Sequence, residues 1–376
     1  MWGIAKRTYL DWAAASPVSE RARRVFSAAL MAYGNPGALH AEARSAKALL
    51  EDARTRIARL AEVKTDGVVF TSGATEANAL ALLGSVRARG VVGAHILYQA
   101  SAHASVVGAL ELLKEEGATI EALDLARVKE QLRPETALIT LDAVNSETGE
   151  RFDTLSVRRA IDGEKRSTLL HVDASQAPIA ESITLAHWGA DLMTLDAQKV
   201  GAVRGIGVLL MRQGIALAPL TRGGGQEGGR RPGTESPALA SAFATALTES
   251  AELREKFVEQ SARMRTILID HLARIPRLEI NEGKDTVSHI LNISLLGRDT
   301  DYAVTLLDTA GFAVSTKSAC ETDEPGSRAV RALTHDEERA AATLRISWGH
   351  DTTEKDLERF AEELIRVVRF LDASAL

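Results

Sequence analysis

The stretch "FTSGATEAN", residues 70–78, decides how the first half of this chain folds. It follows a short apolar run, "GVVF", and leads into a pattern in which Leu80, Leu83 and Val86 recur every three residues. The run has the composition of a buried strand, and the spacing places the three apolar side chains on one face of a helix. Small residues between a strand and a helix are typical of the units that build a parallel α/β sheet.

Further apolar runs extend this pattern along the chain. They are "HILYQ" (95–99), "ALITLDAV" (137–144), "LLHVDAS" (169–175), "DLMTLDA" (191–197) and "GVLLM" (207–211). Each is short, rich in Val, Ile and Leu, and bounded by polar residues or glycine, which predicts a buried strand. Amphipathic stretches lie between several of them. The sequence therefore predicts an α/β fold with a mostly parallel central sheet flanked by helices.

The pattern changes after about residue 236. A long helical run (237–274) is followed by strand-like segments, a helical segment (300–310) and a final helix from about Glu354. This order is typical of a smaller α+β domain. We predict a large domain over residues 15–245 and a small domain formed by residues 1–14 and 246–376.

Composition excludes several functional classes. The chain has 376 residues and a formal net charge of -6, with no long basic block, so direct nucleic-acid binding is not expected. It lacks the apolar run of roughly 18 residues that a membrane helix needs. Its single cysteine, Cys320, cannot form an internal disulfide, which favours a cytoplasmic location. The nine histidines show no metal-ligand spacing such as HExxH, so no metal is predicted.

Three segments combine into a cofactor site. The helix start in "FTSGATEAN" offers N–H groups and hydroxyls that suit a phosphate, although the same turn would also serve as a plain helix cap. Asp173 lies at the carboxyl end of a predicted strand, where α/β folds place ligand-binding groups. The same residue could instead serve as the cap of a following helix. Lys199 follows another predicted strand. A buried lysine at that place can form a Schiff base with an aldehyde, but most lysines are solvated surface residues, and Lys199 could be one of them. A phosphate cup, an acid and a lysine are what pyridoxal 5′-phosphate requires.

On these motifs the chain resembles the group I cysteine desulfurases of the NifS/IscS kind, in the class V aminotransferase family of fold-type I pyridoxal enzymes. "YLDWAAASPV" (9–18), "YGNP" (33–36), "FTSGATEAN", "VDASQ" (172–176), "RGGGQEGGRRPGT" (222–234) and "SAC" (318–320) occur in the family's order and at about its spacing. The resemblance implies the family's fold, a homodimer with shared active sites, and L-cysteine as substrate. It also implies a catalytic role for Cys320, the only cysteine in the chain.

The resemblance implies a role for each matching residue. Lys199 would form the Schiff base with pyridoxal phosphate, Asp173 would pair with the ring nitrogen, Gln176 would lie near the phenolic oxygen, and His103 would stack on the ring. The phosphate would contact Ala74, Thr75 and Gln198, together with Thr234 of the other subunit. Asn35 and Arg345 would bind the substrate carboxylate. Cys320 would attack the substrate sulfur, release alanine and keep a persulfide for an acceptor protein, either an iron–sulfur scaffold or a tRNA-thiolation protein.

Four positions depart from the family pattern: Gln198 replaces a histidine, Asp196 a phosphate-binding serine, Ser146 an asparagine that touches the ring oxygen, and Lys317 a small residue. Asp196 would repel a phosphate dianion unless it turns away or Arg204 or Arg231 compensates. Lys317 would lower the pKa of the nearby thiol, or else it is a solvated loop charge.

Two other functions stay open at this point. One is a different enzyme of the same family, a selenocysteine lyase or an aminotransferase-like member, which the cysteine in "SAC" disfavours. The other is a catalytically degenerate member that acts as a binding partner, which Asp196, Gln198 and Ser146 favour. The joint presence of Lys199 and Cys320 favours an active desulfurase over both.

Overall fold

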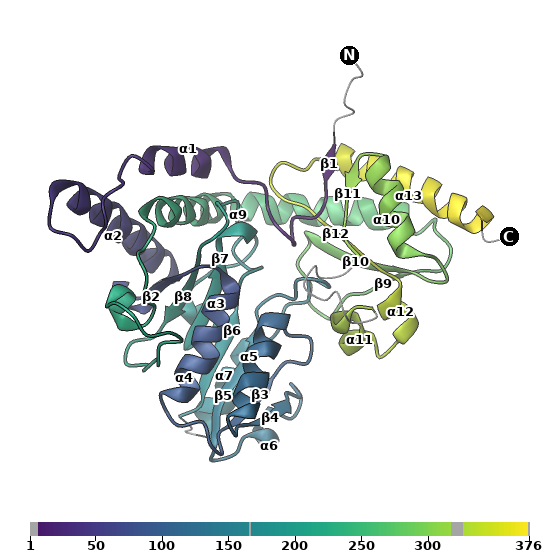
Figure 1. Cartoon of the computed structure of the whole chain (residues 1–376). Coiled ribbons are helices and arrows are strands. Elements are labelled where there is room, and N and C mark those ends of the chain that lie inside the picture. The colour runs from purple at the N-terminus through teal and green to yellow at the C-terminus, as the bar shows by residue number, and fades with distance from the viewer. Residues whose placement is uncertain (1–6, 165–166, 317–325, 375–376) are drawn as a thin grey trace. The chain divides into compact units, whose positions relative to one another are not determined.

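The computed structural model describes residues 7–164, 167–316 and 326–374, and the chain divides into two compact units. Unit 1 comprises Met1–Ser16, Val144–Arg151 and Leu253–Leu376, and unit 2 comprises Pro17–Ala143 and Phe152–Glu252. The long helix α9 (Pro237–Leu272) contributes residues to both units, and the predicted boundary at residue 245 falls within it. Figure 1 draws the elements of both units.

Unit 2 contains a seven-stranded sheet. Its strands, in spatial order, are β2 (Val68–Thr71), β8 (Gly207–Met211), β7 (Leu192–Asp196), β6 (Leu169–Asp173), β5 (Thr136–Asp142), β3 (His95–Tyr98) and β4 (Thr119–Ala122). Only β8 runs antiparallel to its neighbours, so the predicted mostly parallel sheet is confirmed. The edge strand β4 was not predicted, because its partly exposed residues lack the apolar composition of the other strands.

The α-helices that precede α9 belong to unit 2 with this sheet, and α3 packs on its strands β7 and β8 (Figure 1). They are α1 (Glu20–Ala29), α2 (Ala41–Ala61), α3 (Ala74–Ala79), α4 (Ser85–Arg87), α5 (Ala104–Glu115), α6 (Val128–Gln131), α7 (Thr154–Gly163) and α8 (Leu185–Trp188). A π-helical turn, η2 (Leu80–Gly84), joins α3 to α4. The predicted apolar face of Leu80, Leu83 and Val86 lies in the core together with residues of α5 and the sheet. Burial of this face therefore fixes the helix that follows "FTSGATEAN" on the sheet.

Three neighbouring strands of unit 2 end in an aspartate. Asp142 ends β5, Asp173 ends β6 and Asp196 ends β7. Asp142 and Asp173 are register partners, and Asp173 pairs with Thr194, two residues before Asp196. Because the three strands are parallel, their carboxyl ends meet at one edge of the sheet, where ligands bind in α/β folds.

Unit 1 is an α+β unit. Its strands form an antiparallel sheet in the order β12 (Thr343–Ser347), β10 (Ile290–Leu295), β9 (Leu278–Ile280), and a parallel pair of β1 (Thr8–Tyr9) with β11 (Phe312–Ala313). Its helices are α10 (Thr300–Thr309), α11 (Arg328–Thr334), α12 (Glu337–Ala341) and α13 (Glu354–Ser374). The small α+β architecture predicted for this part of the chain matches these elements.

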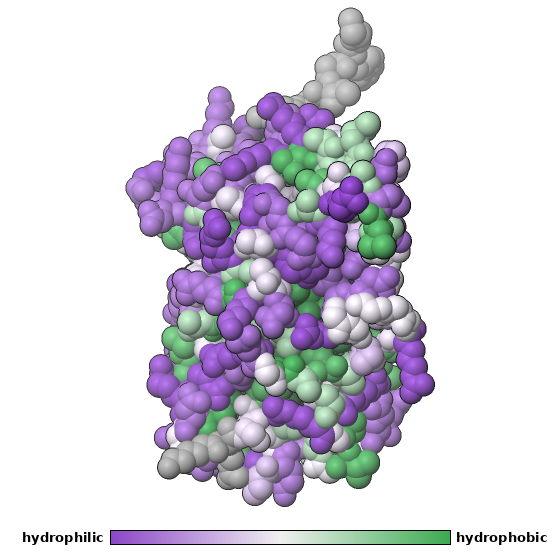
Figure 2. Space-filling view, turned by 90° about the vertical axis from the view of Figure 1, so that its left-hand side faces the viewer, coloured by the Kyte–Doolittle hydropathy of each residue, from purple (hydrophilic) through white to green (hydrophobic). Residues whose placement is uncertain are grey.

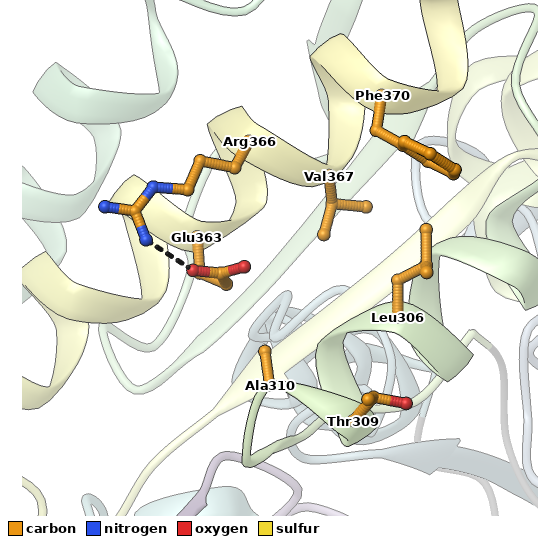
Figure 3. A pocket seen from close by; sticks show the side chains of 7 residues that line it. All are labelled: Leu306, Thr309, Ala310, Glu363, Arg366, Val367 and Phe370. Carbon is orange, nitrogen blue, oxygen red and sulfur yellow. Dashed lines mark hydrogen bonds and ion pairs between the residues drawn. The ribbon is translucent and has the colours of Figure 1, made fainter. Parts of the chain in front are cut away.

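A shallow pocket of about 320 Å³ lies between α10 and α13 (Figure 3). It is lined by Leu306, Thr309, Ala310, Glu363, Arg366, Val367 and Phe370. Glu363 and Arg366 form an ion pair of 3.0 Å along α13, and the other lining side chains are mostly apolar. None of the predicted site residues lines this pocket, so it is separate from the predicted cofactor site.

The glycine-rich segment, residues 222–234, is anchored by a buried ion pair. Glu227 accepts hydrogen bonds from Arg54 Nη1 at 2.8 Å, from Arg54 Nη2 at 2.7 Å and from the Phe70 N–H at 2.9 Å. Its side chain is 1% exposed and its φ is 50°. Burial alone would lower the pKa of Arg54, but the hydrogen bonds and charge of Glu227 outweigh burial and raise it.

We expect Glu227→Gln to destabilise unit 2 by about 3 to 5 kcal/mol, because it leaves the Arg54 charge buried without its main partner. Glu51→Gln is the matched control. Glu51 contacts the same arginine at 3.3 Å, but its side chain is 48% exposed, so its removal should cost less than about 1 kcal/mol. Urea denaturation of the two variants measures the difference. Equal midpoints would show that the Glu227 pair does not hold the segment.

Candidate functional site

The carboxylate of Asp173 lies at the centre of the predicted cofactor site. It is buried at the end of β6 and accepts hydrogen bonds from Asn78 Nδ2 at 2.7 Å, Ser175 Oγ at 2.6 Å and the Ser175 N–H at 3.0 Å. A buried carboxylate needs such donors to offset its lost hydration. Asp173 is therefore held in one orientation, with Asn78 supplied by α3.

A chain of hydrogen bonds connects Asp173 to His103. Asn78 Nδ2 also donates to Ser105 Oγ at 2.9 Å, and Ser105 Oγ lies 2.8 Å from His103 Nδ1. The Ser105 N–H donates to the same His103 nitrogen at 3.1 Å, so Nδ1 is an acceptor and the proton of the neutral ring lies on Nε2. The side chain of His103 thereby caps α5. Asn78 and Ser105 were missed by the sequence reasoning, although Asn78 lies within "FTSGATEAN".

Lys199 comes from the strand next to that of Asp173. It is half-buried in the 3₁₀ turn η3 (Ala197–Lys199), which follows β7 directly, and β7 pairs with β6. Gln176 is buried in the turn after β6. Lys199, Asp173 and Gln176 therefore lie at the same edge of the sheet, as the cofactor hypothesis requires.

Asp196 occupies the place where the sequence predicts a phosphate. Its Oδ2 accepts a hydrogen bond from the Ala74 N–H at 3.1 Å, and its Oδ1 accepts one from the Gln198 N–H at 3.0 Å. The turn before α3 is tightly packed, because a Cβ on Gly207 would lie 2.6 Å from the Gly73 carbonyl carbon. The Asp196 carboxylate therefore points toward the start of α3 rather than away from it. Thr75, which follows Ala74 in the chain, is exposed.

Arg231, one of the two arginines that the sequence suggested as compensating charges, pairs with Glu76. Its Nε donates to Glu76 Oε1 at 3.0 Å, and Glu76 Oε2 accepts the Ser72 N–H at 2.5 Å. Burial would raise the pKa of Glu76, but the hydrogen bonds from Arg231 and Ser72 outweigh it and lower the pKa. Arg231 therefore ties the glycine-rich segment to the start of α3.

The structure places Asn35 beside the glycine-rich segment. Both line a pocket of about 290 Å³ in unit 2, formed by Asn35, Pro36, Gly37, Lys47, Leu50, Glu51, Gly225, Gln226 and Glu235. Asn35 Oδ1 accepts the Gly37 N–H at 2.9 Å, and Thr234 is exposed directly before Glu235. These two predicted residues thus lie near one another in unit 2.

Arg345 lies in unit 1, on β12, and its side chain is 2% exposed. One guanidinium nitrogen donates to Asp11 Oδ1 at 2.8 Å and the other to the Ser146 carbonyl at 2.9 Å. Its Nε has no hydrogen-bond partner among the residues that the structure describes. The backbone of Arg345 also pairs with Ser315, just before the cysteine segment. Cys320 and Lys317 lie outside the described residues.

A buried histidine links three strands beneath the site. His171 Nδ1 lies 2.8 Å from Thr140 Oγ1 and its Nε2 lies 3.1 Å from Thr194 Oγ1. Burial lowers the pKa of His171 to about 4, and the nearby Asp173 charge opposes this only in part. Burial likewise lowers the pKa of His289 in unit 1 to about 3.

We expect the free energy of unfolding to fall as the pH drops from about 6.5 to 4. Both histidines are neutral in the folded state and take up protons once the chain unfolds, so the stability present above pH 6.5 is lost on acidification. His171→Gln should flatten this slope by up to about 1.4 kcal/mol per pH unit. Urea denaturation at several pH values tests it; an unchanged slope contradicts the neutral His171.

Neither a metal site nor a membrane span was found in the described part of the chain. Over residues 7–164, 167–316 and 326–374, no group of three or more His, Cys, Asp or Glu side chains is arranged to hold a metal ion. Within the same ranges, no helix is both long and apolar enough to cross a membrane.

Comparisons with known proteins identify the family of this chain. The family model "Aminotransferase class-V" matches residues 8–360. The chain is 30% identical to "Cysteine desulfurase IscS 1" of Archaeoglobus fulgidus, over 96% of this chain and 97% of that protein. It superimposes on the structure "NIFS-LIKE PROTEIN" with a TM-score of 0.91 and 24% identity, covering 97% and 100% of the two chains. "SspA in complex with cysteine" gives a TM-score of 0.77 and 26% identity, over 90% and 98%.

The fold and the family match thus define a protein of the pyridoxal-enzyme class. The chain belongs to the class-V aminotransferase family, because that model covers nearly its whole length. Within the family it belongs with the cysteine desulfurases of the IscS and NifS kind.

The family implies pyridoxal phosphate as cofactor, and the residues that the sequence predicts to bind its ring are compatible with it. A buried carboxylate fixed by three hydrogen bonds suits a protonated pyridine nitrogen, and an amine follows on the adjacent strand. The phosphate end fits less well, because Asp196 accepts the Ala74 N–H.

Proposed function

We propose that this protein is a pyridoxal-phosphate-dependent cysteine desulfurase, which converts L-cysteine to L-alanine and collects the sulfur as a persulfide on Cys320. The observation that carries the proposal is that Asp173 ends β6 and Lys199 lies in the turn directly after the adjacent strand β7, so both lie at one edge of the sheet. The similarity to desulfurases over nearly the whole chain supports it.

Each residue of the site has a proposed task. When bound, the cofactor withdraws electrons from the substrate's Cα. Asp173 would hold a proton on the ring nitrogen, and Gln176 would contact the phenolic oxygen. Lys199 would attach the cofactor and then move the α-proton. His103, whose ring is fixed by Ser105, would stack on the cofactor ring.

Binding of phosphate and substrate is assigned by the same reasoning. Ala74, Thr75 and Gln198 would contact the cofactor phosphate. Arg345 would bind the substrate carboxylate, and its buried Nε is a donor that such a ligand satisfies. Asn35 would assist it.

Sulfur transfer needs no additional oxidant. The Cys320 thiolate would attack the substrate sulfur, so an S–S bond forms while the substrate C–S bond breaks. The electron pair of that bond stays on carbon, which takes a proton and leaves as alanine. The persulfide then passes its outer sulfur to an acceptor protein, an iron–sulfur scaffold or a tRNA-thiolation protein. Lys317 would favour the thiolate form of Cys320.

We also propose a homodimer with shared sites, in which Thr234 reaches the partner's cofactor phosphate. Four large apolar residues of the α1–α2 region support it, because they are 56–90% exposed: Leu30, Met31, Tyr33 and Leu39. On the face shown in Figure 2, hydrophilic residues predominate and apolar residues gather in smaller patches. Burial of these four side chains against a partner subunit would remove their apolar surface from water.

We propose that the protein is located in the cytoplasm.

The alternatives are less well supported. Relatives that match the chain over nearly all of its length are named cysteine desulfurases. A degenerate binding protein does not need the hydrogen-bonded path from His103 to Asp173 that this site keeps.

The purified protein and its reaction with cysteine test this function. The protein should absorb visible light, and borohydride reduction should bleach the colour and leave a label on Lys199. Added cysteine with a reductant should give alanine and sulfide in equal amounts. A colourless protein that binds no added pyridoxal phosphate, or a coloured one that forms no alanine, would refute the proposal.

A further inference from the structure

The carboxylate of Asp196 connects α3 to η3, the two elements that supply the predicted phosphate-binding residues Ala74 and Gln198. It is 7% exposed at the end of β7, and its two oxygens accept the N–H groups of Ala74, at the start of α3, and Gln198, in the turn that carries Lys199. Gln198 Nε2 also lies 3.5 Å from Asp196 Oδ2. Asp196 therefore takes the place of an external anion at the Ala74 N–H.

A second carboxylate engages the backbone just before this helix start. Glu76 accepts the Ser72 N–H at 2.5 Å and the Arg231 Nε–H at 3.0 Å. The start of α3 thus carries two negative side chains, Asp196 and Glu76, and Arg231 is already paired with Glu76. Charges this close to one another and partly buried are screened only weakly by salt.

We propose that Asp196 is a specificity-determining residue that weakens binding of the phosphorylated cofactor. A phosphate dianion must displace the carboxylate from the Ala74 N–H and then remain near its charge. Pyridoxal, whose 5′-hydroxyl is neutral, meets no such repulsion and has a proton to donate to the Asp196 carboxylate. The chain consequently discriminates between the two vitamers less than a serine at this position would allow. This inference rests on the proposed function, because it assumes that the cofactor binds at Lys199.

Two substitutions of Asp196 distinguish the effect of its negative charge on cofactor binding from the effect of its size. Asp196→Asn removes the charge, keeps the volume and preserves an oxygen for the Gln198 N–H. Asp196→Ser also frees the Ala74 N–H for a phosphate. Asp66→Ser is the matched control, because Asp66 is an exposed aspartate of the same unit and its loss changes net charge equally.

The experiment is a titration of the cofactor-free full-length protein with pyridoxal phosphate and, separately, with pyridoxal, followed by visible absorbance and by borohydride labelling of Lys199. Both Asp196 variants should bind pyridoxal phosphate at least tenfold more tightly than the wild type, which is about 1.4 kcal/mol. Their affinity for pyridoxal should change less than threefold. The Asp66 control should match the wild type for both ligands.

The ratio of the two affinities within each variant cancels general effects of the substitution on folding. An unchanged or weaker affinity of both variants for pyridoxal phosphate overturns the inference, and so does an equal change for both ligands. In those cases the wild type still labels at Lys199, so the proposed function survives. If no variant, the wild type included, labels at Lys199 with either ligand, both the inference and the proposed function fail.

Discussion

Lys199→Ala should yield a protein that no longer holds its cofactor covalently and turns over cysteine more than about a thousandfold more slowly. The substitution removes both the amine that attaches the aldehyde and the base that moves the α-proton. The spectrum of the purified variant, its borohydride labelling and its rate of alanine formation measure the loss. Its thermal midpoint should stay near that of the cofactor-free wild type, because Lys199 lies in a half-buried turn outside the core.

Lys64→Ala is the matched control for this variant. Lys64 is an exposed lysine of unit 2 that precedes the short turn η1 (Thr65–Gly67) and provides no side-chain cap to it. The control should keep the colour and the rate. Retention of borohydride label in Lys199→Ala would show that another lysine carries the cofactor.

Cys320→Ser should lower sulfide release from cysteine to less than about one part in a thousand while leaving the cofactor absorbance intact. A serine hydroxyl does not attack sulfur as a thiolate does, and the ring-binding residues belong to other segments. Mass spectrometry of the wild type after cysteine addition should find one extra sulfur on the peptide that contains Cys320. Because Cys320 is the only cysteine in the chain, no other residue can carry that persulfide.

Ser318→Ala is the control here, since it changes a neighbouring side chain of the same segment and keeps the thiol. It should retain most of the activity. Sulfide release at the wild-type rate by Cys320→Ser would remove the thiol from the mechanism and leave only the cofactor chemistry.

Much of the fold follows from local patterns in the sequence. Buried strands such as Leu169–Asp173 and Gly207–Met211 are continuous apolar runs, so they are recognisable without knowing their neighbours. Strand order is not local. β3 lies between β4 and β5, and β8 reverses direction between β2 and β7, and both facts depend on long-range packing.

Some residues of the candidate site could likewise be predicted from local sequence, and others could not. Asp173 and Lys199 follow recognisable strands, and parallel strands bring their ends together. Asn78, Ser105 and Glu227 were not found, because each acts through a contact with a distant segment. The orientation of Asp196 could not be predicted either, since a side chain at a strand end can point toward a helix start or away from it; here the Ala74 N–H decides it.

The parallel pair of β1 and β11 bears on how the protein is made. Thr8 is paired with Phe312, and Asp11 is bound to Arg345, so the first segment of unit 1 finds its partners only near the end of translation. At about 5 to 20 residues per second, the roughly 300 residues between Thr8 and Phe312 take about 15 to 60 s to synthesise. Leu10 and Trp12 are buried in the finished protein, and we expect them to be accessible to chaperones on the nascent chain during that interval.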